Sequence, residues 1–409
     1  MEWSESYRFN IYQEVRNTPF VTSAQKARRR FAKGKPHKTL IRRKKGMVIK
    51  METVRIGIIG CGGIANGKHM PSLKQLPNVK MVAFCDIIEE RALKAKADYG
   101  SADASVYTDY KKLLENKSID VVHVCTPNRS HSFITVDALE AGKHVMCEKP
   151  MAINSAEAKK MLDAAKKTGK KLTIGYQTRQ TAGAQYLKTE AMNGTFGDIY
   201  YAKATALRRR AVPTWGVFLN EYEQGGGPLI DIGTHSLDLT LWIMDNYKPK
   251  YCVGTSYHKL NNSLNQGNAW GKWDPEKFTV EDSAFGFIVM ENGATINLES
   301  AWALNMLDVR EATTLICGTL AGADLYDGVR INGIRNDVQY TLRPTLNPTG
   351  AAFFEGVNSA DPSVIEAAQW IDAVINDKTP CVLPEQAYTV TRILEGIYTS
   401  AATGDIYRF

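Results

Sequence analysis

The feature that most constrains the fold is a short apolar run followed by closely spaced glycines, VRIGIIGCGGIA at residues 54–65. The apolar, β-branched residues 54–59 predict a buried parallel strand. The next residues fit the pattern G-x-G-x-x-A, in which Gly60 permits a tight turn and Gly62 lets the backbone approach a pyrophosphate. Ala65 lets the following helix pack closely on the strand, with its N-terminus toward the phosphates. The stretch therefore predicts a dinucleotide-binding unit, although an ordinary strand-to-helix turn is the alternative.

A carboxylate stands where such a unit binds the adenosine ribose. The run VKMVAFCD predicts a second strand that ends at Asp86, 26 residues after Gly60. An acid at this place binds the ribose hydroxyls, and a carboxylate repels a 2′-phosphate. No basic residue immediately follows Asp86, so NAD is expected in preference to NADP. The alternative is that Asp86 only caps the next helix.

Strands and helices continue to alternate up to Tyr176. Helical patterns cover 90–100, 131–142 and 155–169, and strand patterns cover 120–127, 143–150 and 170–176. Repeated βα units predict a doubly wound parallel sheet, which binds ligands at the carboxyl ends of its strands. We expect the cofactor to meet Gly60, Gly62, Gly63, Ile64, Ala65, Asp86, Thr126, Pro127, Asn128, His131, Glu148, Lys149 and Gln177.

After Tyr176 the pattern changes to longer alternating stretches. Asn292 and Gly293, within MENGATI, are a strong signal for a β-hairpin. A mostly antiparallel sheet is expected, with one face covered by an apolar helix at 228–245 and the other open for a second subunit. Amphipathic helices follow at 362–377 and 384–404, and we expect them to pack back on the first domain.

Two polar residues interrupt the apolar helix GGGPLIDIGTHSLDLTLWIM at 225–244. Asp231 and His235 are four residues apart, which places them on one face of a helix. The face is either ordinary surface or part of a site. Lys149, which directly follows a predicted strand, presents a similar choice. It is either a solvated lysine at a strand end or a partly desolvated group suited to acid–base work.

The excess positive charge of the chain lies in residues 1–50. The chain has 51 basic and 43 acidic residues, but 14 basic and 3 acidic ones fall in this segment, so the remainder is slightly acidic. We expect residues 1–50 to be a disordered leader upstream of a native start at Met47 or Met51, with a nucleic-acid or membrane-surface arm as the alternative. The body gives no electrostatic reason to bind nucleic acid, and no apolar run is long enough for a membrane span.

Five motifs together resemble one enzyme family. In order they are GIIGCGGIA, FCD, CTPNRSH, EKPMA and GGGPLIDIGTHSLDL. The set is similar to the Gfo/Idh/MocA oxidoreductases, which include glucose-fructose oxidoreductase and inositol dehydrogenase, and within them to the sugar- or glycoside-active branch. The resemblance covers the chain from about Arg55 to its C-terminal helices. It implies a Rossmann domain at 51–176 and a substrate-binding and oligomerisation domain at 177–409, an α/β domain with a large open sheet.

The resemblance also implies roles for particular residues. Lys149, Asp231 and His235 would surround the reacting carbinol as catalytic residues, and NAD would accept the hydride. His235, with an ordinary pKa near 6.5, suits the role of base, and Lys149 would stabilise the alkoxide. The expected substrate-binding residues are Arg179, Arg208, Arg209, Trp215, Tyr222, Asp231 and His235. Surface or core positions are the alternatives for the arginines and for Trp215.

Three functions remain open from the sequence. The first is an NAD-dependent dehydrogenase of a sugar, glycoside or cyclitol. The second is a glycosidase that retains its NAD. It would oxidise the sugar to a keto form, eliminate the glycosidic bond, add water and reduce the ketone again. The third is a non-enzymatic NAD-binding regulator. The seven cysteines form no CxxC pair, which favours buried thiols in a reducing, cytoplasmic setting, and a homodimer or homotetramer is expected.

Overall fold

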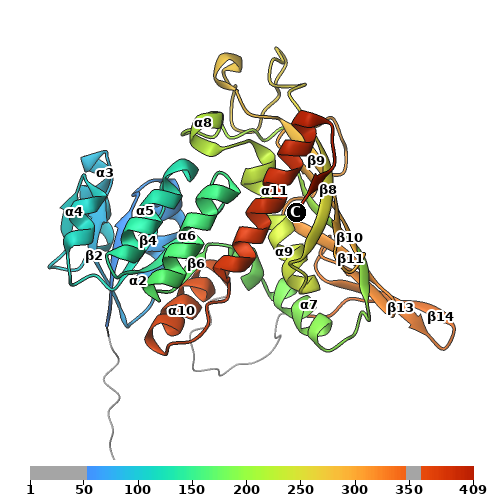
Figure 1. The fold of residues 1–409 in the computed structure, drawn as a ribbon, viewed down its shortest axis with the longest axis horizontal. Coiled ribbons are helices and arrows are strands. Elements are labelled where there is room, and N and C mark those ends of the chain that lie inside the picture. The colour runs from blue at the N-terminus through green and yellow to red at the C-terminus, as the bar shows by residue number, and fades with distance from the viewer. Residues whose placement is uncertain (1–52, 347–360) are drawn as a thin grey trace, which may run out of the picture. The chain divides into compact units, whose positions relative to one another are not determined.

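The computed structural model describes residues 53–346 and 361–409. The expectation for residues 1–50 therefore lies outside the described residues. The chain forms a six-stranded β-sheet first and a nine-stranded β-sheet second, and helices pack on both sheets (Figure 1). The predicted α/β class, with a parallel sheet followed by a mostly antiparallel one, is confirmed. The predicted division at Tyr176 stays a prediction.

The first sheet is parallel throughout and has the strand order β3-β2-β1-β4-β5-β6. Its strands are β1 (Val54–Ile59), β2 (Val79–Cys85), β3 (Ser105–Tyr107), β4 (Val121–Val124), β5 (His144–Cys147) and β6 (Leu172–Ile174). The order reverses direction between β1 and β4, and ligands bind at such a switch point. Ile56 and Ile58 of β1 are fully buried, as expected for a strand between two layers of helices.

Helices connect these strands on both sides of the sheet. They are α2 (Met70–Lys74), α3 (Glu89–Tyr99), α4 (Tyr110–Glu115), α5 (Asn128–Glu140) and α6 (Ser155–Thr168). A π-helical turn, η1 (Ala65–His69), joins the glycine loop to α2. The short elements β3 and α4 were not predicted. A strand of three residues and a helix of six are too short to show a periodicity in the sequence.

The second sheet has the order β14-β13-β12-β11-β7-β10-β9-β8-β15. Its strands are β7 (Ile199–Leu207), β8 (Pro249–Tyr257), β9 (Ser283–Met290), β10 (Thr295–Ala301), β11 (Thr313–Gly318), β12 (Ala321–Asp324), β13 (Arg330–Arg335), β14 (Val338–Leu342) and β15 (Tyr407–Arg408). Only the β7–β10 pair is parallel. The predicted hairpin is confirmed, because β9 and β10 pair antiparallel across a turn in which Gly293 has φ 87°.

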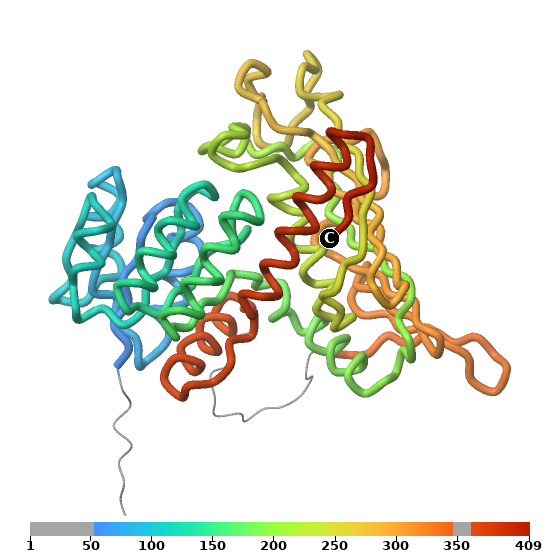
Figure 2. Tube along the Cα trace, in the orientation of Figure 1, coloured from blue at the N-terminus to red at the C-terminus, as the bar shows by residue number. Residues whose placement is uncertain are grey.

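Helices cover one face of the second sheet. A π-turn, η3 (Leu229–Gly233), continues into α9 (Thr234–Met244), which packs against β7 and β11. The predicted helix at 228–245 is therefore present, with a wider first turn. In Figure 2, α11 (Pro384–Thr403) runs along the same sheet, while α10 (Pro362–Ile375) lies beside the first one. Trp370 and Ile371 of α10 join the core around β1.

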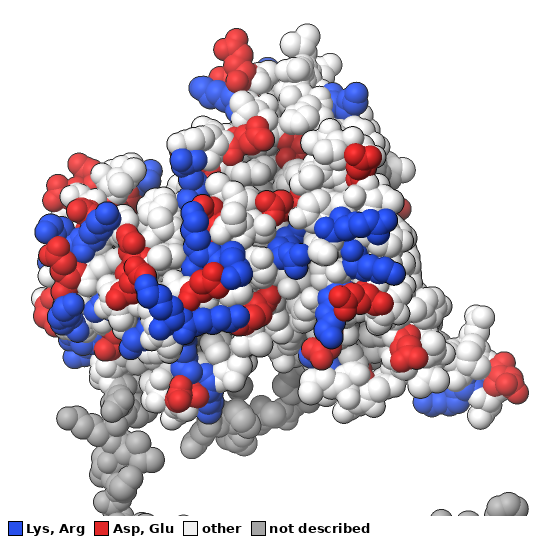
Figure 3. Space-filling model, viewed as in Figure 1, with Lys and Arg blue, Asp and Glu red and all other residues white. Residues whose placement is uncertain are grey.

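Charged side chains of both signs are interspersed over the face drawn in Figure 3. Several form ion pairs within or beside α6, such as Lys159 with Asp163 and Lys167 with Glu140. Within the described residues, no helix is both long and apolar enough to cross a membrane.

Candidate active site

The helix that carries Asp231 and His235 is buried almost everywhere else. Between Leu229 and Ile243, these two are half-buried, whereas every other residue is buried, including Trp242 at 8% exposure. Their spacing of four residues gives them a common face, as predicted. The rest of the segment packs into the second domain, with Leu237, Leu239 and Leu241 completely inaccessible. The two polar residues are therefore not part of an ordinary solvent-facing side.

Lys149 meets Asp231 at the carboxyl end of the first sheet. Lys149 follows β5 in sequence, and its Nζ donates to both Oδ1 and the main-chain oxygen of Asp231, each at 2.9 Å. The side chains retain only 17% and 13% of their exposure, so the ion pair is partly desolvated. Trp302, at the end of β10, donates from Nε1 to the other carboxylate oxygen of Asp231 at 3.1 Å. Asp231 is thus fixed from both sides.

His235 is held beside this pair. Its Nδ1 lies 3.4 Å from Oγ1 of Thr178, and the ring of Tyr176 packs edge-on against the imidazole with centroids 6.3 Å apart. Burial and the nearby Lys149 ammonium lower the pKa of His235 to about 3, despite the opposing charge of Asp231. For Asp231, burial opposes ionisation, but Lys149 outweighs it and keeps the pKa below its usual value. The imidazole of His235 is therefore neutral at physiological pH, and the charges of Lys149 and Asp231 both act on it.

Glu148 anchors the loop that presents Lys149. The carboxylate of Glu148 is buried and accepts from Lys68 Nζ and lies 2.7 Å from His69 Nε2; it also accepts from the Lys149 main-chain N–H. Lys68 makes a second ion pair with Glu366 of α10 at 2.9 Å. Burial opposes ionisation of Glu148, but Lys68 and His69 hold its pKa well below the usual value. Because its oxygens have protein partners, Glu148 supports the loop instead of facing outward.

The glycine loop has the geometry expected of a phosphate cradle. Gly60 has φ 89°, and a Cβ there would lie 2.6 Å from the main-chain oxygen of Cys125, so only glycine fits. A Cβ at Gly62 or at Gly63 would meet no protein atom within 4 Å, which leaves the loop open on that side. Ala65 is fully buried where the helix packs on β1, whereas Ile64 is 41% exposed.

Asp86 lies against this loop, at the end of β2. Its Oδ2 accepts from the main-chain N–H of Cys61 at 2.8 Å, and its Oδ1 accepts from the N–H of Ile88 at 2.9 Å. The second contact means that Asp86 also stabilises the turn into α3. Both readings of Asp86 from the sequence are therefore compatible with its position.

The loop after β4 is tied to the Lys149 loop. His131 is buried, and its ring nitrogens lie 2.8 Å from the main-chain oxygens of Thr126 and Pro150. It therefore joins two loops and has no ring nitrogen left for a ligand. Asn128 donates to the main-chain oxygen of Gln224, and Pro127 precedes α5. The hydroxyl of Thr126 is buried and has no hydrogen-bond partner among the described residues.

Two expected ligand residues follow β6 and have different surroundings. Gln177 is half-buried at the start of the 3-10 turn η2 (Gln177–Gln180). Arg179 in the same turn has no exposed surface, and its guanidinium binds both carboxylate oxygens of Asp238 at 2.6 and 2.8 Å. Arg179 also donates to Gln386 and to the main-chain oxygen of Cys381. The expectation that Arg179 binds substrate is corrected, because all its donors are directed into the core.

The remaining expected substrate residues lie on the loops beyond β7. The guanidinium of Arg208 pairs with Glu311 and lies 5.1 Å from the ring centroid of Trp270. Arg209 and Trp215 are exposed. Tyr222, in α8 (Glu221–Gln224), is also exposed and lies over the guanidinium of Arg129 in α5 at 3.6 Å. Arg208 is the member of this group whose charge acts directly on Asp231.

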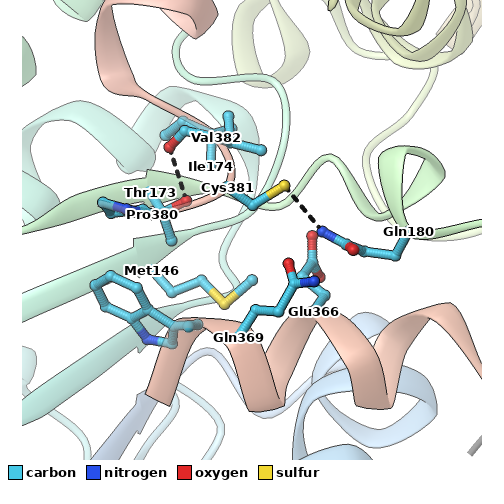
Figure 4. A pocket seen from close by; sticks show the side chains of 10 residues that line it. Met146, Thr173, Ile174, Gln180, Glu366, Gln369, Pro380, Cys381 and Val382 are labelled. Atoms are coloured by element: carbon cyan, nitrogen blue, oxygen red, sulfur yellow. Dashed lines mark hydrogen bonds between the residues drawn. The ribbon is translucent and has the colours of Figure 1, made fainter. Parts of the chain in front are cut away.

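Neither of the two cavities described contains these side chains. Figure 4 shows a cavity of about 10 Å³ between α10 and the end of β6, lined among others by Glu366, Trp370 and Cys381. It has room for about one water molecule, so it cannot hold a nucleotide or a sugar. A groove of about 690 Å³ lies at the other ends of α7 (Ala182–Met192) and α9, near Tyr200 and Asn292.

Comparison with known families identifies both parts of the chain. Residues 54–176 match the model of the oxidoreductase family with an NAD-binding Rossmann fold, and residues 184–323 match the Gfo/Idh/MocA C-terminal domain. D-glucoside 3-dehydrogenase of Escherichia coli is 36% identical over 351 residues, which are 86% of this chain and 96% of that protein. The chain belongs to the Gfo/Idh/MocA oxidoreductase family. It is thus an NAD(P)-dependent oxidoreductase, and the non-enzymatic alternative is set aside.

Other proteins are similar over part of the sequence or in fold. Myo-inositol 2-dehydrogenase of Thermotoga maritima is 32% identical over 191 residues, which are 47% of this chain and 55% of that protein. Levoglucosan dehydrogenase in complex with NADH has a TM-score of 0.73 at 22% identity, covering 87% of this chain and 99% of that one. Aldose-aldose oxidoreductase from Caulobacter crescentus, with a TM-score of 0.71 at 23% identity, covers 88% and 100%.

Three residues in this Gfo/Idh/MocA site were missed from the sequence. Trp302 supports Asp231, Thr178 contacts His235, and Lys68 pairs with Glu148. Lys68 gave little signal, because the turn that carries it, ANGKH at 65–69, also contains Asn66 and His69. Trp302 and Thr178 gave none, since a tryptophan at a strand end and a threonine in a turn are both common.

Proposed function

We propose that this protein is an NAD-dependent dehydrogenase that oxidises a hydroxyl carbon of a sugar, glycoside or cyclitol, with D-glucosides as the first candidates. The observation that carries the proposal is the contact between Lys149 and Asp231 beside His235. At the edge of a nucleotide-binding sheet, a neutral imidazole can accept the hydroxyl proton and an ammonium can stabilise the alkoxide in alcohol oxidation. The resemblance to D-glucoside 3-dehydrogenase supports the substrate class.

The residues around the glycine loop fit a dinucleotide. The open side of Gly62 and Gly63 leaves room for a pyrophosphate, and the unpartnered hydroxyl of Thr126 lies at the end of a neighbouring strand. Asp86 would meet the adenosine ribose. A carboxylate there disfavours a 2′-phosphate, which supports NAD over NADP. When bound, the nicotinamide supplies the acceptor for a hydride.

Each catalytic side chain has a distinct task in this proposal. The Lys149 ammonium binds the oxygen of the reacting hydroxyl and stabilises its developing negative charge. His235 accepts the hydroxyl proton as the carbinol carbon loses its hydrogen as hydride, which leaves a ketone. Asp231 orients Lys149 and can bind a further substrate hydroxyl. The proposal assigns the proton to Nδ1, which lies 3.4 Å from the Thr178 hydroxyl, so that Nε2 of His235 carries the lone pair that acts as base.

The low pKa of His235 is consistent with its proposed role as base and with the proposed role of Lys149 in stabilising the alkoxide. With a pKa of about 3, the imidazole is neutral, and therefore able to accept a proton, over the whole physiological range. A base this weak removes a hydroxyl proton only if the hydroxyl is made more acidic. The Lys149 charge does so in the partly desolvated site.

Turnover with glycosides tests the proposal against the glycosidase alternative. The enzyme is incubated with free sugars, methyl glycosides and aryl glycosides, each with and without added NAD. NADH formation that needs added NAD and releases no aglycone supports the dehydrogenase. Aglycone release over many turnovers without net NADH identifies the NAD-retaining glycosidase instead.

We further propose that the uncovered face of the second sheet packs against a second copy of the chain. Val253 of β8 and Phe287 of β9 are cross-strand neighbours on this face and are 38% and 42% exposed. Exposed apolar neighbours in a large sheet are typical of subunit interfaces. Light scattering should give the mass of a dimer or tetramer, and Phe287→Arg should lower it. A monomeric wild-type protein would contradict this arrangement.

A further inference from the structure

Two exposed tryptophans lie together on the loops beside the active site. Trp215 follows β7 and Trp270 follows β8, and their rings pack edge to face with centroids 4.9 Å apart. They are 51% and 43% exposed, whereas every other tryptophan among the described residues is at most 8% exposed. Large aromatic surface left in water beside a reactive centre points to a ligand that covers it.

Hydrogen bonds between the two loops hold the pair in place. The hydroxyl of Thr214 donates to the main-chain oxygen of Trp270 at 2.7 Å. The side chain of Asn268 both accepts from and donates to the main chain of Val212, at 2.8 and 3.0 Å. The two loops also run close together in Figures 1 and 2, next to α8. The tryptophan surface is therefore preformed, which lowers the entropy lost when a ligand binds.

A chain of contacts connects this surface to Asp231. Trp215 packs on Phe218, Phe218 packs on Trp302, and Trp302 donates to the Asp231 carboxylate. On the other side, the Arg208 guanidinium lies over the ring of Trp270, and its charge acts on Asp231. The tryptophan pair is thus linked to Asp231 through packed side chains on one side and through Arg208 on the other.

We propose that Trp215 and Trp270 form a subsite for the group attached through the glycosidic oxygen of the substrate. The chemistry that fits is a ring with an apolar face, either an aryl aglycone or the C–H face of a second pyranose. The exposed Arg209 and the amide of Asn305, which accepts from Arg210, supply polar groups nearby. This inference rests on the proposed dehydrogenase function and adds a preference for ring-bearing glycosides.

Matched glycosides of one sugar test the subsite. From a panel of methyl glycosides, the one oxidised fastest is compared with the phenyl glycoside and the disaccharide of the same sugar. The wild-type enzyme should prefer the ring-bearing substrates. Trp270→Ala should lower kcat/KM for the preferred one by ~10-fold, mainly through KM, and leave the methyl glycoside within ~2-fold. Trp215→Ala should lower kcat/KM for the preferred one as well. Trp270→Phe should restore most of the preference.

The outcomes separate the subsite from the dehydrogenase itself. Leu264→Ala is the matched control, because Leu264 is 93% exposed on the loop that carries Trp270. Equal losses for methyl and ring-bearing substrates, or no loss for either, would overturn the subsite while leaving the proposed function intact. A wild-type enzyme that oxidises no member of the panel would overturn the proposed function on which the subsite depends. Whether phenyl or disaccharide substrates lose more identifies the kind of ring bound.

Discussion

The Lys149 ammonium lies 2.9 Å from the Asp231 carboxylate, although 82 residues separate them in the chain. One comes from the strand ends of the nucleotide-binding sheet and the other from the first turn of a helix on the second sheet. The contact joins a loop of the first sheet to a helix that covers the second sheet. It also places Lys149 where its charge lowers the pKa of His235.

Replacing Lys149 by Met should abolish most of the activity. The variant keeps the length of the side chain but loses the charge that acidifies the hydroxyl and stabilises the alkoxide. We expect kcat to fall by ~10²–10⁴-fold, with NAD affinity close to that of the wild-type protein. Steady-state kinetics and calorimetric titration with NAD measure the two effects. A turnover near the wild-type rate would remove Lys149 from the catalytic set.

His235 should couple stability to pH. In the folded protein, burial and Lys149 lower its pKa to about 3, whereas the unfolded chain keeps a value near 6.5. Between these values the unfolded state binds more protons, so the free energy of unfolding decreases as pH falls. The His235→Asn variant has no imidazole at this position and therefore lacks this part of the pH dependence of the free energy of unfolding. Denaturant unfolding at about pH 7.5 and about pH 5 should show a smaller pH effect in the variant. An unchanged effect would contradict the buried, neutral imidazole.

Trp302→Phe should slow catalysis without unfolding the protein. The variant keeps an aromatic ring in the core but removes the hydrogen bond from Nε1 to Asp231. Asp231 is then free to change its position relative to Lys149. We expect kcat to fall by ~10-fold, with a modest decrease in Tm. Trp370→Phe is the control for loss of a buried indole, because Trp370 Nε1 has no hydrogen-bond partner among the described residues.

Asp86→Ser should weaken the discrimination between NAD and NADP. The wild-type carboxylate, held against the glycine loop by the N–H of Cys61, repels a 2′-phosphate. We expect wild-type kcat/KM to favour NAD by at least ~10-fold, and the variant to narrow this ratio. Equal use of both cofactors by the wild-type enzyme would be evidence against the proposed role of Asp86.

Arg179→Met should destabilise the fold and leave substrate binding unchanged. The substitution leaves the carboxylate of Asp238 buried without its partner, which typically costs about 3–5 kcal/mol. Thermal unfolding should show a large decrease in Tm, while KM measured below that temperature stays near the wild-type value. A selective increase in KM with an unchanged Tm would restore Arg179 to the substrate site.

Local sequence patterns were sufficient to predict most of the helices and strands. The glycine motif, the βα alternation, the Asn292–Gly293 hairpin and the apolar helix with Asp231 and His235 were all predicted. Each is determined by short-range physics: backbone freedom at glycine, the two-residue period of strands and the 3.6-residue period of helices. The short elements β3 and α4 escaped detection because three to six residues do not show a period.

What only the tertiary structure decided is which side chains meet across the chain. The sequence alone determined the strand, turn and helix that present Lys149, Asp231 and His235. It could not distinguish Arg179, which turns into the core toward Asp238, from Arg208, whose charge reaches Asp231. Nor did the sequence predict that Trp270 packs on Trp215 or that Trp302 donates a hydrogen bond to Asp231. Such contacts depend on how separate elements pack, and the periodicity within one element does not indicate which other element it will contact.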